Sequence, residues 1–205
     1  VLFLNNPSYS YRDKIDGILL ALNKYASFIY LDTDAILINS FQLPLPAYVD
    51  CAAVLAPVRI PQGWSDVHVP SFFPEYNTGF LYFRSSILVK QLIHSWLDVY
   101  DRAFSLFNQV WDQASFRSVL WSFIKSKKLY FLPFPAEFNL RLTKPWIAGK
   151  GSLVYIVHGR IRPEELPPLK AYLDSNINRF RTWAEWQSLY PNTSLRLKIP
   201  KDPFL

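Results

Sequence analysis

Two aspartates separated by one residue, Asp32 and Asp34, follow an apolar run in the segment ASFIYLDTDAILINS, residues 26–40. The β-branched and aromatic residues of that run predict a strand buried on both faces, of the kind found in parallel sheets. In extended backbone, residues two apart point the same way, so both carboxylates should face one spot while Thr33 faces another. Ligands of parallel α/β sheets gather at the carboxyl ends of the strands, which makes this spot a candidate binding site.

The chemistry that such a pair supports is the binding of a hard divalent cation. Carboxylate oxygens suit Mg²⁺ or Mn²⁺ far better than thiophilic metals, and two crowded carboxylates repel each other unless a cation joins them. A cation held by few protein ligands shares its remaining positions with substrate phosphates, so a diphosphate is the natural ligand. The same two aspartates also fit a solvated loop in which one of them caps a turn.

The composition indicates one globular domain, residues 1–205, with a sizeable core. Half of the residues are apolar and 17% are aromatic, which excludes a disordered segment and a coiled coil. No apolar run approaches the roughly 18 residues of a membrane span, and no signal peptide opens the chain, so we expect a soluble domain. The basic residues behind the net charge of +6 are scattered, and no nucleic-acid-binding signature is present, so nucleic acid is not an expected partner.

Strand-like and helical patterns alternate along the chain, which predicts an α/β fold with a mostly parallel sheet. The loop from Pro57 to Tyr76 is long enough to be a lid, and Ser85 or Ser86 is the predicted N-cap of the helix after it. The single cysteine, Cys51, is expected to be a buried, inert thiol. Helices are predicted around residues 15–22, 89–100, 111–128 and 177–191, and strands within residues 1–4, 26–40, 51–57, 79–84, 129–134 and 152–159.

The acidic pair is the first of four motifs that follow one another along the chain in the same order as in a known group of enzymes. IYLDTDAIL resembles the Asp-x-Asp segment of nucleotide-sugar glycosyltransferases with the GT-A fold, particularly the retaining galactosyltransferase and glycogenin-like group and the related nucleotide-diphospho-sugar transferases. In that group an Asn-x-Gly turn before another strand follows, matched by YNTGFLYFRSS, and then an Asp-Gln pair that opens a helix, matched by VWDQASF. A strand ending in histidine comes last, matched by VYIVHG. The resemblance covers roughly residues 12–160.

The resemblance implies a GT-A, Rossmann-like fold, with a mostly parallel central sheet flanked by helices. That fold normally opens with a strand, a nucleotide-binding loop and a helix well before the acidic pair, and this chain reaches Asp32 too soon to contain them all. The chain has no methionine and begins with Val1, so we expect that residues preceding Val1 supplied the first nucleotide-binding strand. The compartment, cytoplasmic or Golgi-lumenal, is left open.

The resemblance also implies roles for individual residues, each with a structural alternative. Asn77–Gly79 also fits plain turn chemistry, Asp112 a helix cap, His158 a hydrogen-bonded structural histidine and Lys14 a surface residue. His68 and His94 match no motif and are expected to be a loop and a helix residue. The implied metal ligands are Asp32, Asp34 and His158; the donor-binding residues are Lys14, Thr33, Asn77, Thr78 and Gly79; Asp112 and Gln113 are the catalytic pair that orients sugar hydroxyls; Asn139 and Arg141 are candidate acceptor or phosphate contacts.

The resulting hypothesis is a glycosyltransferase dependent on Mn²⁺ (or Mg²⁺). It would move a sugar from a nucleotide-diphosphate donor, a UDP-sugar, to a hydroxyl of a glycan, protein or small-molecule acceptor, with retention of configuration. One alternative is a catalytically inactive module that binds a nucleotide sugar or a glycan. A metal-dependent phosphoryl-transfer enzyme is a weaker alternative, because the sequence has no Gly-rich phosphate-binding loop.

Overall fold

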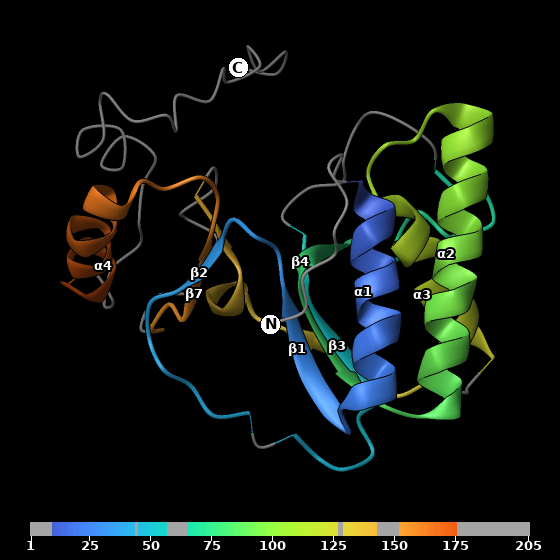
Figure 1. Ribbon diagram of the computed structural model, residues 1–205, viewed down its shortest axis with the longest axis horizontal. Coiled ribbons are helices and arrows are strands. Elements are labelled where there is room, and N and C mark those ends of the chain that lie inside the picture. Colours follow the sequence, from blue (N-terminus) through green and yellow to red (C-terminus); the bar gives the residue numbers. More distant parts are fainter. Residues whose placement is uncertain (1–9, 44, 57–64, 127–128, 143–151, 176–205) are drawn as a thin grey trace. The chain divides into compact units, whose positions relative to one another are not determined.

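The computed structural model of the chain describes residues 10–43, 45–56, 65–126, 129–142 and 152–175. The chain divides into two compact units (Figure 1): unit 1 comprises residues 1–31 and 43–134, and unit 2 comprises residues 32–42 and 135–205. The prediction of a single domain over residues 1–205 stays a prediction. The strand predicted within residues 1–4 and the helix predicted at 177–191 lie outside the described residues.

The sheet of unit 1 has four described strands in the order β1-β4-β3-β5, which are β1 (Ser27–Leu31), β4 (Tyr76–Arg84), β3 (Cys51–Leu55) and β5 (Phe131–Phe134). β4 is antiparallel to both of its neighbours, and only β3 and β5 are parallel. The prediction of a mostly parallel sheet is therefore wrong for the described strands. Apolar patterning reports burial but not direction, and a parallel neighbour needs a long crossover, usually a helix, whereas the described part of the β3–β4 connection contains none.

β1 is the edge strand of this sheet as far as the structure describes it. It was expected to be buried on both faces, but Ile29 is 37% exposed and Ser27 is also exposed. The expectation was wrong because an apolar run does not tell whether a second layer covers the other face of the sheet, to which Ser27 and Ile29 point. None of the residues of β1 is fully buried, and Phe28 and Tyr30 are the two that pack, half-buried, against the core of unit 1.

Three helices cover one side of the sheet of unit 1, namely α1 (Tyr11–Lys24), α2 (Ile87–Phe107) and α3 (Gln113–Lys125) (Figure 1). Ile15, Ile18 and Leu22 of α1 repeat at helical spacing and are buried, as their sequence predicted. Of the two candidate N-caps of α2 it is Ser86 that serves, because its Oγ accepts from the N–H of Val89 (3.1 Å). These helices share one apolar core with β3 and β4, which fixes the sheet against them.

The described half of the predicted lid, residues 65–75, is anchored to unit 1. Arg117 on α3 is buried, and its guanidinium donates to the carbonyl oxygens of Phe73 (3.0 Å) and Pro70 (2.7 Å). Phe73 is itself buried in the core. Residues 57–64 of the same loop lie outside the described part of the chain.

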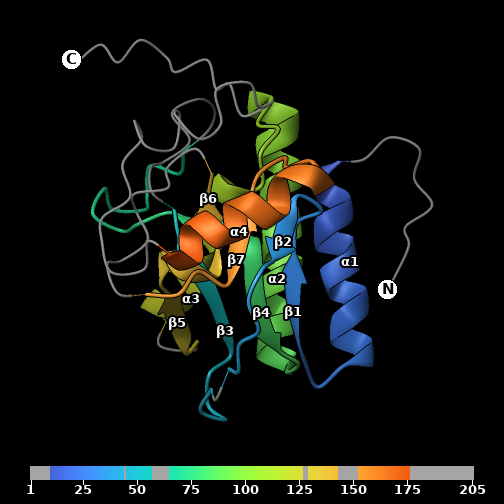
Figure 2. The same ribbon diagram turned by 90° about the vertical axis from the view of Figure 1, so that its left-hand side faces the viewer.

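Unit 2 has a three-stranded sheet in the order β2-β7-β6, formed by β2 (Ala35–Leu37), β7 (Ile156–His158) and β6 (Leu140–Arg141). β7 is antiparallel to β2 and parallel to β6. The 3-10 helices η1 (Ala136–Phe138) and η3 (Pro163–Glu165) precede β6 and α4 (Leu166–Ser175), respectively. Leu169 and Leu173 of α4 pack on Leu140 and Val157, and Figure 2 shows the helix crossing this small sheet.

None of the helices that the structure describes is long and apolar enough to cross a membrane.

Candidate functional site

Asp32 and Asp34 lie in a turn rather than on a continuous strand. The apolar run divides into β1, which ends at Leu31, and β2, which begins at Ala35. The turn between them is closed by a hydrogen bond from the N–H of Ala35 to the carbonyl oxygen of Asp32 (3.0 Å). The two aspartates do lie close together, but the alternation of an extended strand is not the cause. Thr33, between them, is exposed.

The pairing of β2 with β7 brings His158 to this turn. Ala35 lies opposite His158 in the antiparallel register, and the N–H of Gly159 donates to the carbonyl oxygen of Asp34 (3.0 Å). Gly159 has a φ of 150°, which L side chains rarely adopt, and an added Cβ would lie 3.1 Å from the side chain of Leu142. A glycine is therefore required directly after the histidine.

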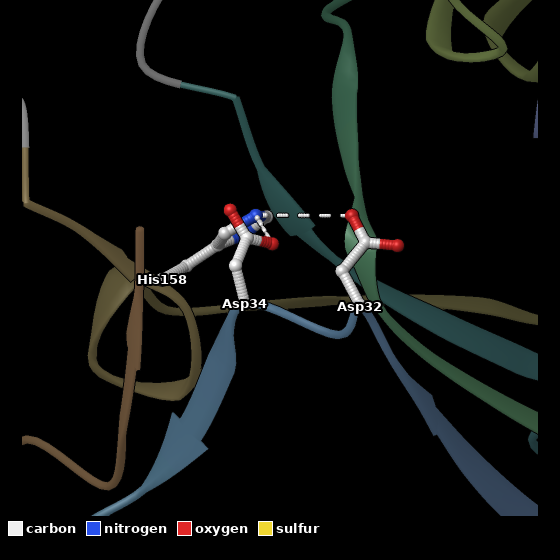
Figure 3. Close-up of side chains that lie close together, drawn as sticks. All are labelled: Asp32, Asp34 and His158. Carbon is white, nitrogen blue, oxygen red and sulfur yellow. Dashed lines mark ion pairs between the residues drawn. The ribbon is translucent and has the colours of Figure 1, made fainter. Parts of the chain in front are cut away.

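The side chains of Asp32, Asp34 and His158 converge on one point (Figure 3). Nε2 of His158 lies 3.2 Å from Oδ1 of Asp34 and 3.7 Å from Oδ2 of Asp32. The histidine side chain is 4% exposed, whereas those of Asp32 and Asp34 are 18% and 41% exposed. The imidazole of His158 is therefore buried, whereas the two carboxylates are partly exposed, so a ligand can reach them.

The three side chains fit a divalent cation. Ligand atoms at about 2.1 Å from an octahedral cation lie about 3.0 Å apart in adjacent positions, close to the distances that Nε2 makes here. One ligand atom from each residue lies within 4.8 Å of the others. Two carboxylates and an imidazole form a set of hard and borderline donors. Asp32, Asp34 and His158 could therefore hold a metal ion.

His158 has two further contacts within unit 2. Its Nδ1 lies 2.8 Å from Oδ1 of Asn139, and its Nε2 lies 3.3 Å from Nη1 of Arg141. Arg141 lies opposite His158 in the parallel register of β6 and β7, and Asn139 directly precedes β6. The sequence predicted these two residues only as acceptor or phosphate contacts, and it missed their proximity to the histidine. Their spacing, two residues apart at the start of a strand, was the available signal.

The charges around the turn lower the pKa of the Asp34 carboxyl. The hydrogen bond to His158 is the largest cause; partial burial acts in the opposite direction, and the positive charge of Arg141 adds a smaller lowering. A carboxyl with a lowered pKa remains ionised to lower pH, which suits a cation ligand.

A second group of predicted residues lies within unit 1. Nζ of Lys14 is 3.0 Å from Oδ2 of Asp112 and 3.3 Å from Oγ1 of Thr78, which itself donates to Oδ1 of Asp112 (3.1 Å). The side chains of Lys14 and Asp112 are 0% and 3% exposed. Nζ of Lys14 also lies 5.4 and 5.5 Å from the ring centres of Tyr11 and Tyr30. Lys14 is thus a buried residue, and the alternative of surface placement is wrong.

Asn77, Thr78 and Gly79 belong to β4 rather than to a turn before it. They are buried, and the register between β3 and β4 shifts at this point, so the segment forms a bulge. Oδ1 of Asn77 accepts from the N–H of Gly79 (2.8 Å), which is the short-range chemistry expected of a turn, here placed inside a strand.

Asp112 and Gln113 lie at the start of α3, as predicted. Asp112 is the residue before the helix, but its side chain makes no capping hydrogen bond, so the cap alternative is wrong. Gln113 is buried, and its amide donates to Glu75, a buried carboxylate that the sequence did not single out. His68 and His94 are exposed and lie in a loop and on α2, as expected.

Comparison with known proteins identifies the fold. No protein-family model and no curated protein matches the chain. Among solved structures, that of the galactosyltransferase LgtC in complex with donor and acceptor sugar analogues is similar, with a TM-score of 0.51 and 14% sequence identity. The match covers 91% of this chain and 74% of the LgtC chain. At this identity the likeness concerns the fold alone: the chain has a mixed α/β fold, with sheets flanked by helices, similar to that of this galactosyltransferase.

Proposed function

We propose that this protein is a glycosyltransferase that uses a divalent cation to move a sugar from a nucleotide-diphosphate donor to a hydroxyl acceptor. The observation that carries the proposal is the convergence of Asp32, Asp34 and His158 in a chain whose fold is similar to that of a galactosyltransferase. A UDP-sugar donor and retention of configuration are parts of the proposal that rest on the sequence resemblance. The solved structure of LgtC, which contains donor and acceptor sugar analogues, supports the same class of reaction.

Asp32, Asp34 and His158 would hold Mn²⁺ or Mg²⁺. The imidazole nitrogen favours Mn²⁺, because Mg²⁺ prefers an all-oxygen set of ligands. When bound, such a cation acts as a Lewis acid that stabilises the negative charge developing on the departing diphosphate. The partial exposure of both carboxylates leaves room for the phosphate oxygens of a donor.

Arg141 is the cationic side chain of unit 2 that we assign to the diphosphate. It is half-buried and lies beside His158, so its guanidinium is near the point where phosphate oxygens would meet the metal ligands. A planar guanidinium forms paired hydrogen bonds with phosphate oxygens, and its charge favours the leaving group once the glycosidic bond breaks.

We propose that the buried group of unit 1 binds and orients the donor sugar. Asp112 and Gln113 would accept from and donate to sugar hydroxyls, and Asn77, Thr78 and Gly79 would line the donor from the β4 bulge. Nζ of Lys14 lies 3.0 Å from Oδ2 of Asp112, so its ammonium is placed to balance a charge on this buried carboxyl group. Thr33, exposed beside the acids, completes the predicted donor contacts. Orientation of this kind is what a retaining transfer, which works without a strong general base, requires.

The experiment is a screen of nucleotide sugars with Mn²⁺, in which released nucleoside diphosphate and transferred sugar are measured. We expect turnover with at least one donor, its loss with a chelator, and its loss in Asp34→Asn but not in Asp174→Asn, a change at another half-exposed carboxylate of unit 2. The anomeric configuration of the product, read by NMR, tests retention. Mn²⁺-dependent binding of UDP without turnover would favour the inactive binding module. If the protein bound neither UDP nor Mn²⁺, the proposal would be overturned.

A further inference from the structure

We propose that Glu75 is a positioning residue that holds the NH₂ group of the Gln113 side chain, so that the amide oxygen of Gln113 is offered to a hydroxyl of the donor sugar. The inference rests on the proposed function, because it concerns how Gln113 meets that sugar. Glu75 lies directly before β4 and belongs to none of the four sequence motifs.

The hydrogen bond between the two side chains determines which end of the amide faces Glu75. Nε2 of Gln113 donates to Oε1 of Glu75, and both residues are buried. A carboxylate only accepts hydrogen bonds, whereas a side-chain amide has donors on its nitrogen and an acceptor oxygen. If the amide were turned over, two oxygens would face each other where little water can reach them. The carboxylate therefore selects one of the two orientations of the amide.

The opposite end of the amide is accessible to a ligand. Oε1 of Gln113 accepts from no group in the part of the chain that the structure describes, and it is not one of the fully enclosed polar atoms that lack a partner. It therefore reaches open space. A carbonyl oxygen can only accept, so a sugar hydroxyl would donate to Gln113. Of the two roles that an amide can take toward a hydroxyl, the inference assigns to Gln113 the accepting one.

The backbone of unit 1 holds both residues in place. The carbonyl oxygen of Glu75 accepts from the N–H of Ala56 (2.9 Å), directly after β3. The carbonyl oxygen of Asp112, the residue before Gln113, accepts from Nε1 of Trp96 (3.1 Å). A side chain keeps a productive orientation only when its surroundings are fixed in this way. Glu75 can therefore act on the amide as a rigid part of the fold.

The other member of the predicted catalytic pair has its orientation fixed by different partners. The carboxylate of Asp112 lies 3.0 Å from Nζ of Lys14 and accepts from Oγ1 of Thr78 (3.1 Å). These two contacts do not involve Gln113, whose printed side-chain partner is Glu75. Glu75 therefore does for Gln113 what Lys14 and Thr78 do for Asp112.

Glu75→Gln and Asp50→Asn are a matched pair of variants. Each replaces a buried carboxylate of unit 1 by an amide of the same size, and Asp50 lies at the other end of β3, where it pairs with Arg84 (2.7 Å). An amide at position 75 can either accept from Gln113 or donate to it, so both orientations of Gln113 become possible. Glu75→Leu removes the acceptor altogether. Asp50→Asn should lower stability and leave the Gln113 amide as it is.

The direct test is proton–nitrogen NMR of the Gln113 side-chain amide in the whole chain, with its signal assigned by the loss in Gln113→Leu. Amide protons that are buried and hydrogen-bonded exchange slowly with solvent. We expect slow exchange in the wild type and in Asp50→Asn. Exchange should be about 10-fold faster or more in Glu75→Leu, and also faster in Glu75→Gln, because a hydrogen bond to a charged group is lost.

The functional consequence is measured with the UDP-sugar that turns over in the screen of nucleotide sugars. The value of kcat/KM for that donor should fall about 10-fold in Glu75→Gln, because the amide no longer presents its oxygen reliably. The affinity for UDP in the presence of Mn²⁺ should stay at its wild-type value, because UDP carries no sugar to meet Gln113. A purely structural role of Glu75 would change stability without separating these two measurements.

Wild-type exchange and kcat/KM in Glu75→Gln would overturn the inference, as would faster exchange with unchanged kcat/KM. The first result is also the one expected if Glu75 carried a proton and donated to the amide oxygen. If neither variant at position 75 folds, the wild-type signal decides, since rapid exchange would overturn the inference and slow exchange would support it. A protein with the expected exchange in every variant but no turnover of any nucleotide sugar would support the hold of Glu75 on the amide and overturn the proposed function instead.

Discussion

Nζ of Lys14 and Oδ2 of Asp112 form an ion pair 3.0 Å apart in the interior of unit 1, with both side chains almost fully buried. Lys14 lies on α1 and Asp112 lies directly before α3, so the pair links two elements far apart in the sequence. Thr78 bonds to both partners from the bulge in β4. The three side chains therefore form one buried polar network.

Removal of the lysine should be strongly destabilising. Lys14→Met leaves a buried carboxylate without its cation, which costs about 3 to 5 kcal/mol of unfolding free energy. Chemical denaturation measures the loss, and Lys24→Met, at an exposed lysine of the same helix, should change it little. The double variant Lys14→Met with Asp112→Leu should recover much of the loss because neither charge of the pair is left buried. Equal stability of Lys14→Met and Lys24→Met would contradict the description of the pair.

Binding of a cation should stabilise the protein. At a concentration of Mn²⁺ about 100 times the dissociation constant, the folded state gains about 2.7 kcal/mol. Thermal unfolding with and without Mn²⁺ should show this gain in the wild type and not in Asp32→Asn. The control variant Asp174→Asn should show the same gain as the wild type. A shift of equal size in Asp32→Asn would mean that the ion acts elsewhere.

Arg141 should contribute to the binding of the diphosphate and not to the folding of the site. Loss of a charged hydrogen bond costs about 1.5 kcal/mol or more, so Arg141→Met should weaken UDP binding by about 10-fold in the presence of Mn²⁺. Calorimetry measures the change. Lys170→Met removes a charge from the same unit at a half-exposed pair with Asp174, and it should bind UDP like the wild type. Unchanged affinity in Arg141→Met would remove the guanidinium from the proposed donor site.

The thiol of Cys51 should be inert in the folded protein. Cys51 is completely buried in β3, and this burial raises the pKa of its thiol, so the reactive thiolate is scarce at ordinary pH. A thiol reagent should label the native chain only as fast as unit 1 unfolds, and quickly in denaturant. Ser40→Cys, at an exposed position, supplies the positive control for labelling of native protein. Rapid labelling of the native wild type would show that the core opens at β3.

The sequence predicted the elements whose signals are local. The helical spacing of Ile15, Ile18 and Leu22 gave α1, and Ser86 before an apolar periodic segment gave the start of α2. α4 was not among the predicted helices, and Pro167 and Pro168 lie in its first turn, where prolines remove no helical hydrogen bond. The direction of β4 and the open edge of β1 were not predictable in this way, because they depend on which strands become neighbours.

In the candidate site, too, the sequence predicted features with local signals and missed a contact that depends on strand pairing. Spacing within LDTD, together with the resemblance, was enough to select Asp32, Asp34 and His158 as a group. The turn at the acids was one of two alternatives that the sequence left open, whereas the contact between Asn139 and His158 was missed, because it follows from the pairing of β7 with β6. Long-range register of this kind leaves no periodicity in a single chain.

β7 is the middle strand of the small sheet in unit 2, paired with β2 on one edge and with β6 on the other. Because successive residues of a strand face opposite ways, one inserted residue within Ile156–His158 would turn the imidazole to the other face and remove it from both aspartates and from Asn139 in a single step. Natural variation should therefore enter this stretch as substitutions and almost never as insertions or deletions. Protein engineers who wish to lengthen the chain should place additions elsewhere.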